Sequence, residues 1–240
     1  MTEAKTTETG TLEVKKTKSA LEWFDDSGRT RILDRLRSFI CEADNAVFGF
    51  DFPFGFPEST VDADSWRGFL EEFAETFEGK NVNDFPGGFG EEGRPKREDD
   101  HRYGGQSPMS PLIKYQVFYG LRDVLWPLIE KNAISVLPMQ SRRGDKPVLL
   151  EVYPAGTFGR LGLYRTGYKG SGEAEKRRRK ENVHDFQSLD EITIPESSME
   201  AAIESDDALD SSCAVVSVWR ALENGLEIEC SRPVEGHIYV

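Results

Sequence analysis

Four carboxylates stand at positions along this chain of 240 residues where they could take part in chemistry. Asp51 ends the short apolar run 46–50, and Glu151 lies inside the apolar run 147–153. Asp207 and Asp210 are three residues apart at the expected start of a helix, so they share one face of its first turn. Sites in open α/β sheets lie outside the carboxyl ends of the strands. Carboxylates that converge at such an edge can hold Mg²⁺, and two such ions can clamp the attacking and leaving oxygens of a displacement reaction.

Each carboxylate also has a structural interpretation. Asp51 precedes a Phe-Pro dipeptide, where Asp can begin a turn by bonding its own backbone. Glu151 can face the open side of a sheet, but if it is buried it needs a cation or a hydrogen-bond partner to offset its desolvation. Asp207 and Asp210 are favoured at a helix N-terminus by capping and by the helix dipole, worth about 0.3–1 kcal/mol per charge. Taken singly, none of the four requires a catalytic role.

A basic run, Arg177, Arg178, Arg179 and Lys180, stands out on a chain whose 30 basic and 43 acidic residues give a net charge of −13. An acidic surface repels phosphate backbones, so binding of a nucleic acid or a nucleotide has to use a local basic patch. The three arginines are therefore candidate phosphate contacts. The alternative is a solvated helix face. The acidic, Lys-poor composition also suits a salt-rich, halophilic cytoplasm, where charge repulsion is screened.

Composition and motifs exclude several classes of protein. No stretch approaches the roughly 20 apolar residues of a membrane span, and residues 1–10 lack the apolar core of a signal peptide. The three Cys and three His show no metal-ligand spacing, which favours a cytoplasmic protein without a zinc site. Gly88, Gly90 and Gly93 match G-x-G-x-x-G, but two glutamates inside the motif would repel a pyrophosphate. We interpret them as part of a long, flexible loop over 79–107.

Alternating strand and helix patterns predict an α/β fold with a largely parallel sheet. Strands are expected over 11–17, 46–50, 134–139, 147–153, 226–230 and 236–240. Helices are expected over about 28–40, about 65–77, 110–128, 157–163, 172–189 and 206 to about 220. The expected N-terminal caps are Asp62 or Asp64 for the second of these helices, Ser110 for the third and Asp206 for the last. Pro127 is expected to disturb the last turn of the helix over 110–128. The aromatic-rich turn 48–56 is expected to pack in the core, and a stacking platform for bases is the lesser alternative.

The sequence resembles the family called domain of unknown function 429. The resemblance is carried by Ala46–Pro57 (AVFGFDFPFGFP), Leu149–Ala155 (LLEVYPA) and Asp206–Asp210 (DDALD), in this order and spacing. Three further segments support it, and they are 115–123 (YQVFYGLRD), 161–168 (LGLYRTGY) and 235–240 (EGHIYV). The resemblance covers most of the chain from about Thr11 onward.

The resemblance implies a ribonuclease-H-like fold and a metal-dependent nuclease, a phosphodiester hydrolase that uses Mg²⁺ or Mn²⁺. It places Asp51, Glu151 and Asp210 at the family's catalytic, metal-binding positions, with Asp207 as an auxiliary ligand. The metal would activate a water and stabilise the departing oxygen.

One departure from the family pattern concerns residues 1–10 (MTEAKTTETG), which lack the Gly-x-Asp strand that normally carries the leading metal-binding Asp. We expect a disordered tail over 1–10 and a single ribonuclease-H-like domain over 11–240, either shortened at its N-terminus or with a true start further upstream. The alternative function is a non-catalytic member that binds nucleic acid or a nucleotide. A third alternative is a scaffold that binds neither metal nor phosphate.

Overall fold

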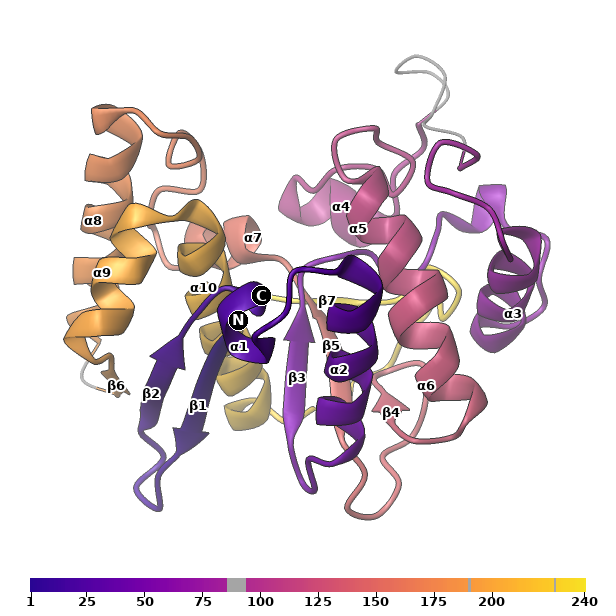
Figure 1. Cartoon of the computed structure of the whole chain (residues 1–240), viewed down its shortest axis with the longest axis horizontal. Coiled ribbons are helices and arrows are strands. Elements are labelled where there is room, and N and C mark those ends of the chain that lie inside the picture. Colours follow the sequence, from indigo (N-terminus) through magenta and orange to yellow (C-terminus); the bar gives the residue numbers. More distant parts are fainter. Residues whose placement is uncertain (86–93, 190, 227) are drawn as a thin grey trace. The chain divides into compact units, whose positions relative to one another are not determined.

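The computed structural model describes residues 1–85, 94–189, 191–226 and 228–240. Contacts divide the chain into two compact units, whose helices and strands Figure 1 labels. Unit 1 comprises Met1–Ile32, Val152–Asn224 and Val240, and unit 2 comprises Leu33–Glu151 and Gly225–Tyr239. The predicted α/β class is confirmed, because a parallel sheet is combined with helices. The ribonuclease-H-like topology and the single domain over 11–240 stay predictions.

Unit 1 contains a three-stranded sheet in the order β1-β2-β6. β1 (Thr2–Thr6) pairs antiparallel with β2 (Leu12–Thr17), and β2 pairs parallel with β6 (Ile192–Thr193). The strand over Thr2–Thr6 differs from the disordered tail that we expected. The cause is strand pairing: β1 is polar and has no strand pattern of its own, but its backbone pairs with that of the next strand, β2.

Helices in the described part of unit 1 accompany this sheet. They are α1 (Ala20–Phe24), α7 (Pro154–Arg160), α8 (Glu173–Gln187), α9 (Glu196–Glu204) and α10 (Asp206–Glu223). α10 contacts β1, β2, α7 and α9, and its apolar face meets the core of the unit. α8 and α10 lie where the sequence predicts them, whereas α9 was not predicted.

Unit 2 contains a sheet in the order β3-β5-β4, with β7 also pairing with β5. The strands are β3 (Val47–Phe50), β4 (Ser135–Val136), β5 (Val148–Val152) and β7 (Ile238–Tyr239). β5 is buried at every residue and pairs parallel with β3 and β4, as its continuous apolar run predicts. β3 is parallel as predicted but only half-buried, because it lies at the end of the strand order. The described residues of the predicted strand 226–230 are not in a strand.

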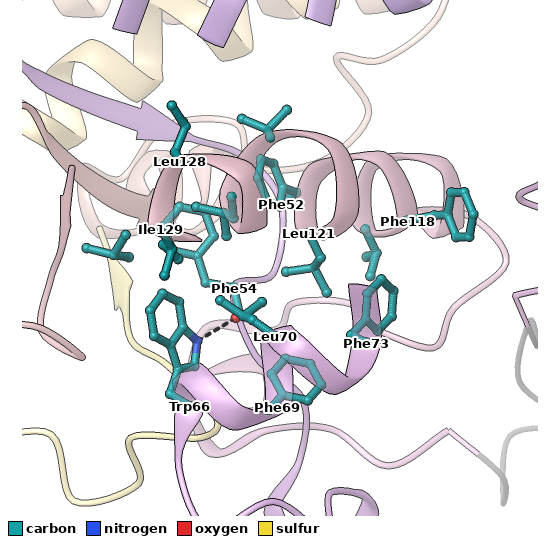
Figure 2. Packing of buried hydrophobic residues seen from close by; sticks show 14 of the residues in the cluster. Phe52, Phe54, Trp66, Phe69, Leu70, Phe73, Phe118, Leu121, Leu128 and Ile129 are labelled. Carbon is teal, nitrogen blue, oxygen red and sulfur yellow. Dashed lines mark hydrogen bonds between the residues drawn. The ribbon is translucent and has the colours of Figure 1, made fainter. Parts of the chain in front are cut away.

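The core of unit 2 combines aromatic rings with aliphatic side chains (Figure 2). Phe52, Phe54 and Phe56 are buried, so the aromatic-rich turn packs in the core, as predicted, and is not a surface stacking platform. The Trp66 indole N–H donates to the carbonyl of Phe54 at 2.8 Å, which satisfies a buried donor. The described helices of this part of the chain are, in order, α2 (Arg29–Cys41), α3 (Trp66–Thr76), α4 (Glu98–Tyr103), α5 (Lys114–Tyr119) and α6 (Trp126–Glu130). A 3₁₀ turn at Glu58–Thr60 lies between α2 and α3.

The predicted helix over 110–128 is interrupted. Ser110 forms a turn, in which its hydroxyl accepts from the N–H of Leu112 at 3.3 Å, and α5 begins only at Lys114. A π-helical turn, Gly120–Leu125, then leads into α6. Pro127 has no N–H to donate to the carbonyl of Asp123, and the Arg37 guanidinium donates to this carbonyl instead. The expected disturbance at Pro127 is therefore present, but it lies on its N-terminal side.

The predicted loop over 79–107 contains α4, which the sequence pattern did not reveal. The Gly88, Gly90 and Gly93 motif lies outside the described residues.

Two helix caps differ from prediction by one or a few residues. The cap of α3 is Ser65, whose hydroxyl accepts from Gly68 N–H at 3.1 Å, and not Asp62 or Asp64. The cap of α10 is Ser205, whose hydroxyl accepts from Ala208 N–H at 3.3 Å, and not Asp206. Ser and Asp are nearly equal as caps, so composition alone does not choose between neighbours.

Replacing Ser65 by alanine is expected to lower the free energy of unfolding by about 1 kcal/mol, because α3 loses the side chain that satisfies an N-terminal donor. Asp64→Ala, at an exposed neighbour, is expected to change it by less than about 0.5 kcal/mol. Urea unfolding of both variants measures the difference, and an equal effect would contradict the assignment of the cap.

Candidate functional site

Two of the four predicted ligands, Asp51 and Glu151, lie at the ends of neighbouring strands in unit 2. In the parallel register of β3 and β5, Phe50 is the partner of Glu151, and Asp51 directly follows Phe50. Both therefore stand near the carboxyl edge of the same sheet, where sites in α/β proteins form. Asp51 is half-buried, whereas Glu151 is only 2% exposed.

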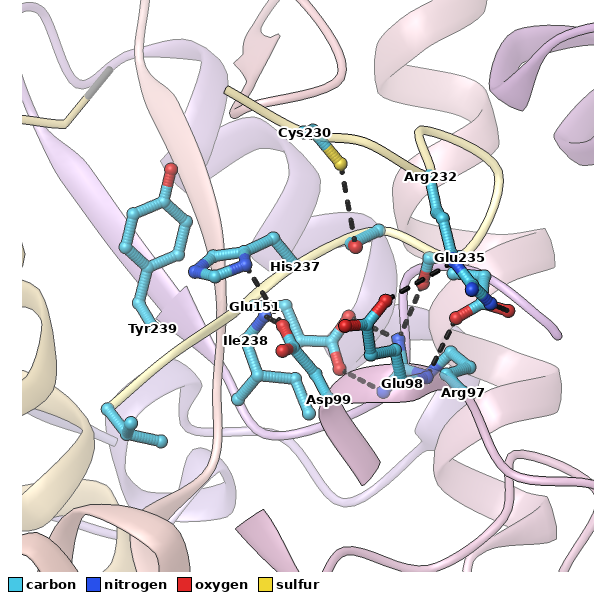
Figure 3. A network of polar contacts seen from close by, with 12 residues as sticks. Arg97, Glu98, Asp99, Glu151, Cys230, Arg232, Glu235, His237, Ile238 and Tyr239 are labelled. Carbon is cyan, nitrogen blue, oxygen red and sulfur yellow. Dashed lines mark hydrogen bonds and ion pairs between the residues drawn. The ribbon is translucent and has the colours of Figure 1, made fainter. Parts of the chain in front are cut away.

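The Glu151 carboxylate is bound by a cation of the chain itself, Arg97 (Figure 3). Arg97 Nη2 donates to Glu151 Oε1 at 2.5 Å, and Nη1 donates to Oε2 at 2.8 Å, which is a bidentate pair. Oε2 also accepts from the backbone N–H of Phe54 at 2.8 Å. Burial raises the pKa of the Glu151 carboxyl, and the guanidinium of Arg97 works against this rise.

Arg97 serves a second carboxylate, Asp100, which is also 2% exposed. Its Nε and Nη2 donate to the two oxygens of Asp100, each at 2.9 Å. Burial opposes the charge on Arg97, but Glu151 and Asp100 together raise the pKa of the guanidinium above its usual value, so Arg97 stays charged. The buried trio thus consists of one cation and two carboxylates.

Residues 235–238, near the C-terminus, form further hydrogen bonds and an ion pair with the segment that carries Arg97. Asp99 Oδ2 accepts from the N–H of Ile238 at 2.8 Å and lies 2.9 Å from Nδ1 of His237. Burial would raise the pKa of the Asp99 carboxyl, but His237 and the Ile238 N–H lower it below its ordinary value. Glu235 is buried, and its two oxygens accept from the N–H groups of Glu58 at 3.1 Å and Glu98 at 2.8 Å.

The other two predicted ligands, Asp207 and Asp210, belong to α10 in unit 1, so the convergence of all four carboxylates stays a prediction. Asp210 is 7% exposed, and it accepts from the hydroxyl of Tyr168 at 2.8 Å and pairs with Lys169 at 2.8 Å. Burial raises the pKa of the Asp210 carboxyl, and Lys169 and Tyr168 oppose the rise. Asp207 lies in the first turn of α10 and is exposed.

These residues do not fit the divalent metal that the resemblance implies. Both oxygens of Glu151 and both of Asp210 are already engaged by donors of the protein. Across residues 1–85, 94–189, 191–226 and 228–240, no group of three or more His, Cys, Asp or Glu side chains is arranged to hold a metal ion. Mg²⁺ requires several oxygen ligands in near-ideal octahedral geometry, and each engaged oxygen would first have to lose its present partner.

The side chains of the basic run lie on different sides of α8, one buried and one exposed. Arg179 is 2% exposed, and its guanidinium donates to four backbone carbonyls of unit 1, so it does not have the exposed position that we expected of a phosphate contact. Arg177 is exposed, and Arg178 is half-buried beside Tyr164. An open depression of about 480 Å³ lies against the exposed face and is lined by Glu173, Ala174, Lys176, Arg177, Lys180 and Ile203.

Sequence reasoning missed the partners in both clusters. Arg97 and Asp100 lie in the predicted loop, far in sequence from Glu151, although a buried Glu151 did require a cation or hydrogen-bond partner. Lys176 was not included in the basic run, although its spacing from Lys180 places both on one helix face. Tyr164 carried no recognisable signal.

The fold and these clusters define an α/β protein with paired, buried carboxylates and an exposed basic helix face. Residues 125–233 match the model of a family described as "Protein of unknown function (DUF429)". The family resemblance indicated by the sequence motifs is therefore confirmed over this segment, which includes Glu151, α8 and α10. Comparison with curated proteins found no match, and neither did comparison with solved structures. Within the described residues, no helix is both long enough and apolar enough to cross a membrane.

Proposed function

We propose that the protein binds the phosphate groups of a nucleic acid or a nucleotide through the exposed face of α8. The observation that carries the proposal is the depression of about 480 Å³ on which three cationic side chains converge, Lys176, Arg177 and Lys180. The chain as a whole has a net charge of −13, so a local concentration of cations is not explained by composition. Such a patch attracts phosphate oxygens electrostatically.

Helix geometry explains why these side chains act together. Glu173, Lys176, Arg177 and Lys180 are spaced i, i+3, i+4 and i+7, which places them on one face of α8. Lys176 pairs with Glu204 at 2.5 Å, and Arg177 Nε lies 3.8 Å from Glu181. Among the described residues Lys180 forms no ion pair. These exposed pairs are worth about 0–1 kcal/mol each, so an incoming phosphate can compete for the cations.

An exposed aromatic ring lies next to Arg178 on another side of α8, outside the residues that line the depression. Tyr164 is 45% exposed, and the guanidinium carbon of Arg178 lies 5.8 Å from its ring centroid. The buried side chain of Asn182 holds the Tyr164 backbone from both sides, accepting from its N–H and donating to its carbonyl, each at 2.9 Å. An aromatic ring next to cations is the arrangement that stacks an unpaired base while the cations hold the phosphates. We therefore favour single-stranded nucleic acid or a nucleotide over duplex.

The test is fluorescence anisotropy with labelled single-stranded DNA, single-stranded RNA and a labelled nucleotide at low salt. The variant Arg177→Gln/Lys180→Gln removes two of the three cations and is expected to weaken binding by about tenfold or more, since each lost contact forfeits part of the electrostatic free energy. Tyr164→Ala is expected to weaken binding by an amount equivalent to about 1–3 kcal/mol for a stacked base.

The matched control is Lys131→Gln/Arg142→Gln, which makes the same change of charge at two exposed residues of unit 2. It is expected to leave affinity nearly unchanged. Equal loss in both double variants would show that only the net charge matters, and absence of binding by the wild-type protein would refute the proposal.

A second candidate function is the metal-dependent phosphodiester hydrolase that the family resemblance implies. The observation in its favour is that Asp51 and Glu151 lie at neighbouring strand ends of one sheet. It predicts that the purified protein cuts DNA, RNA or a small phosphodiester in the presence of Mg²⁺ or Mn²⁺, and that Asp51→Asn abolishes the cutting. Cleavage that survives Asp51→Asn, or no cleavage at all, would eliminate this candidate.

A further inference from the structure

We infer that Arg97 is the resident cation of the strand-end carboxylates Glu151 and Asp100, and that its guanidinium takes the place that a divalent metal would occupy at this edge of the sheet. The inference goes beyond phosphate binding and is independent of it, because these residues belong to unit 2 and the basic face of α8 belongs to unit 1.

The hydrogen bonding of Arg97 is complete. A guanidinium has five N–H donors. Two of them reach Asp100 at 2.9 Å and two reach Glu151 at 2.5 and 2.8 Å, while Nη1 also reaches the carbonyl of Glu235 at 2.9 Å. Every oxygen of the two carboxylates accepts at least one bond from Arg97, so a metal ion could bind them only by displacing the guanidinium.

The backbone that carries Arg97 is held in place by contacts of its neighbours. The N–H of Glu98 donates to Glu235 Oε2 at 2.8 Å, and Asp99 accepts from the N–H of Ile238 at 2.8 Å. Arg97 itself is 2% exposed. Withdrawal of Arg97 from the carboxylates would therefore disturb the attachment of α4 to the C-terminal segment.

The chain also leaves little room for a hydrated ion. Gly236 has a φ of +80°, and a Cβ added there would lie 3.5 Å from Glu151 Oε2 and 3.7 Å from Arg97 Nη1. A side chain at this position would therefore touch the ion pair. Mg²⁺ usually keeps several of its waters when it binds protein, and such waters would need space beside the ion pair.

The experiment compares the Tm of the metal-free wild-type protein with and without millimolar MnCl₂ or MgCl₂, together with calorimetric titration of Mn²⁺. A cation bound at this edge at one hundred times its Kd would raise the Tm by roughly 5 °C or more in a chain of this size. We expect no such rise in the wild-type protein. A rise that is lost in Glu151→Gln would overturn the inference, whereas a rise retained in Glu151→Gln comes from another site and supports it.

For a second variant, Arg97→Met, we expect the opposite result, a rise in Tm with Mn²⁺. Arg97→Met removes the cation and leaves the carboxylates of Glu151 and Asp100 without it. Mn²⁺ is then expected to raise the Tm of Arg97→Met, and this rise is expected to be absent from Arg97→Met/Glu151→Gln. If Arg97→Met fails to fold, the comparison of wild type with Glu151→Gln still decides the question.

Discussion

Arg179→Met is expected to lower the free energy of unfolding by about 1–3 kcal/mol, since it leaves the buried carbonyl of Tyr168 without this donor and removes the donor of three part-buried carbonyls. Arg179 Nε donates to Ile203 O at 2.7 Å, and Nη2 donates to Glu204 O at 3.4 Å. These carbonyls end α9, where a cation is also favoured by the helix dipole. Nη1 donates to Tyr168 O at 2.7 Å and to Gly170 O at 2.8 Å, so one side chain ties α8 to α9 and to the segment before α8.

The control for this prediction is Arg177→Met, two residues earlier on the same helix and exposed. It is expected to change stability by less than about 0.5 kcal/mol while weakening phosphate binding. Denaturant unfolding separates the two roles. Equal stability of the two variants would contradict the structural role of Arg179 and would restore it as a candidate phosphate contact.

Glu151→Ala is expected to lower the free energy of unfolding by about 3–5 kcal/mol, because it removes one partner of a buried ion pair and leaves Arg97 partly unpaired in the interior. Glu130→Ala, at the exposed end of α6, is the matched control and is expected to have an effect within about 0.5 kcal/mol. Urea unfolding in metal-free buffer measures both. A small effect at Glu151 would mean that the pair with Arg97 contributes little and would weaken the case for Arg97 as resident cation.

The elements that could be predicted from the sequence are those with a strong local pattern. The apolar stripe of α2 and the uninterrupted apolar run of β5 each reflect burial against the core, and both elements lie where they were expected. β1 and α9 were missed because neither has an apolar pattern that distinguishes it. Both are stabilised by contacts outside the element itself, β1 by the next strand, β2, and the end of α9 by Arg179.

In the candidate sites too, the sequence indicated the unusual residues but not their partners. The sequence indicated that Glu151 is unusual in an apolar strand and that the run at 177–180 is unusual on an acidic chain. It could not reveal that Arg97 neutralises Glu151, since 54 residues separate them. It also could not reveal that Arg179 faces inward while Arg177 faces outward, because helical periodicity alone does not say which face meets the core when the whole run is charged.

The two clusters lead to different expectations for the two candidate functions. Carboxylates that are already bound to Arg97, Lys169 and Tyr168 have little unsatisfied charge to offer a metal ion, which disfavours the hydrolase. The exposed cations of α8 have only weak competing pairs, which favours binding of phosphate. Phosphate binding by α8 is therefore the central claim.

The most direct test of this claim is the salt dependence of binding to single-stranded DNA. If Lys176, Arg177 and Lys180 each neutralise one phosphate, a plot of log K against log salt has a slope of about −2, and affinity falls roughly 20-fold between 50 and 200 mM salt. In Arg177→Gln/Lys180→Gln the slope is expected to be about −0.7, because one contact remains. An unchanged slope in this variant, or no measurable binding by the wild-type protein at 50 mM salt, would contradict the claim.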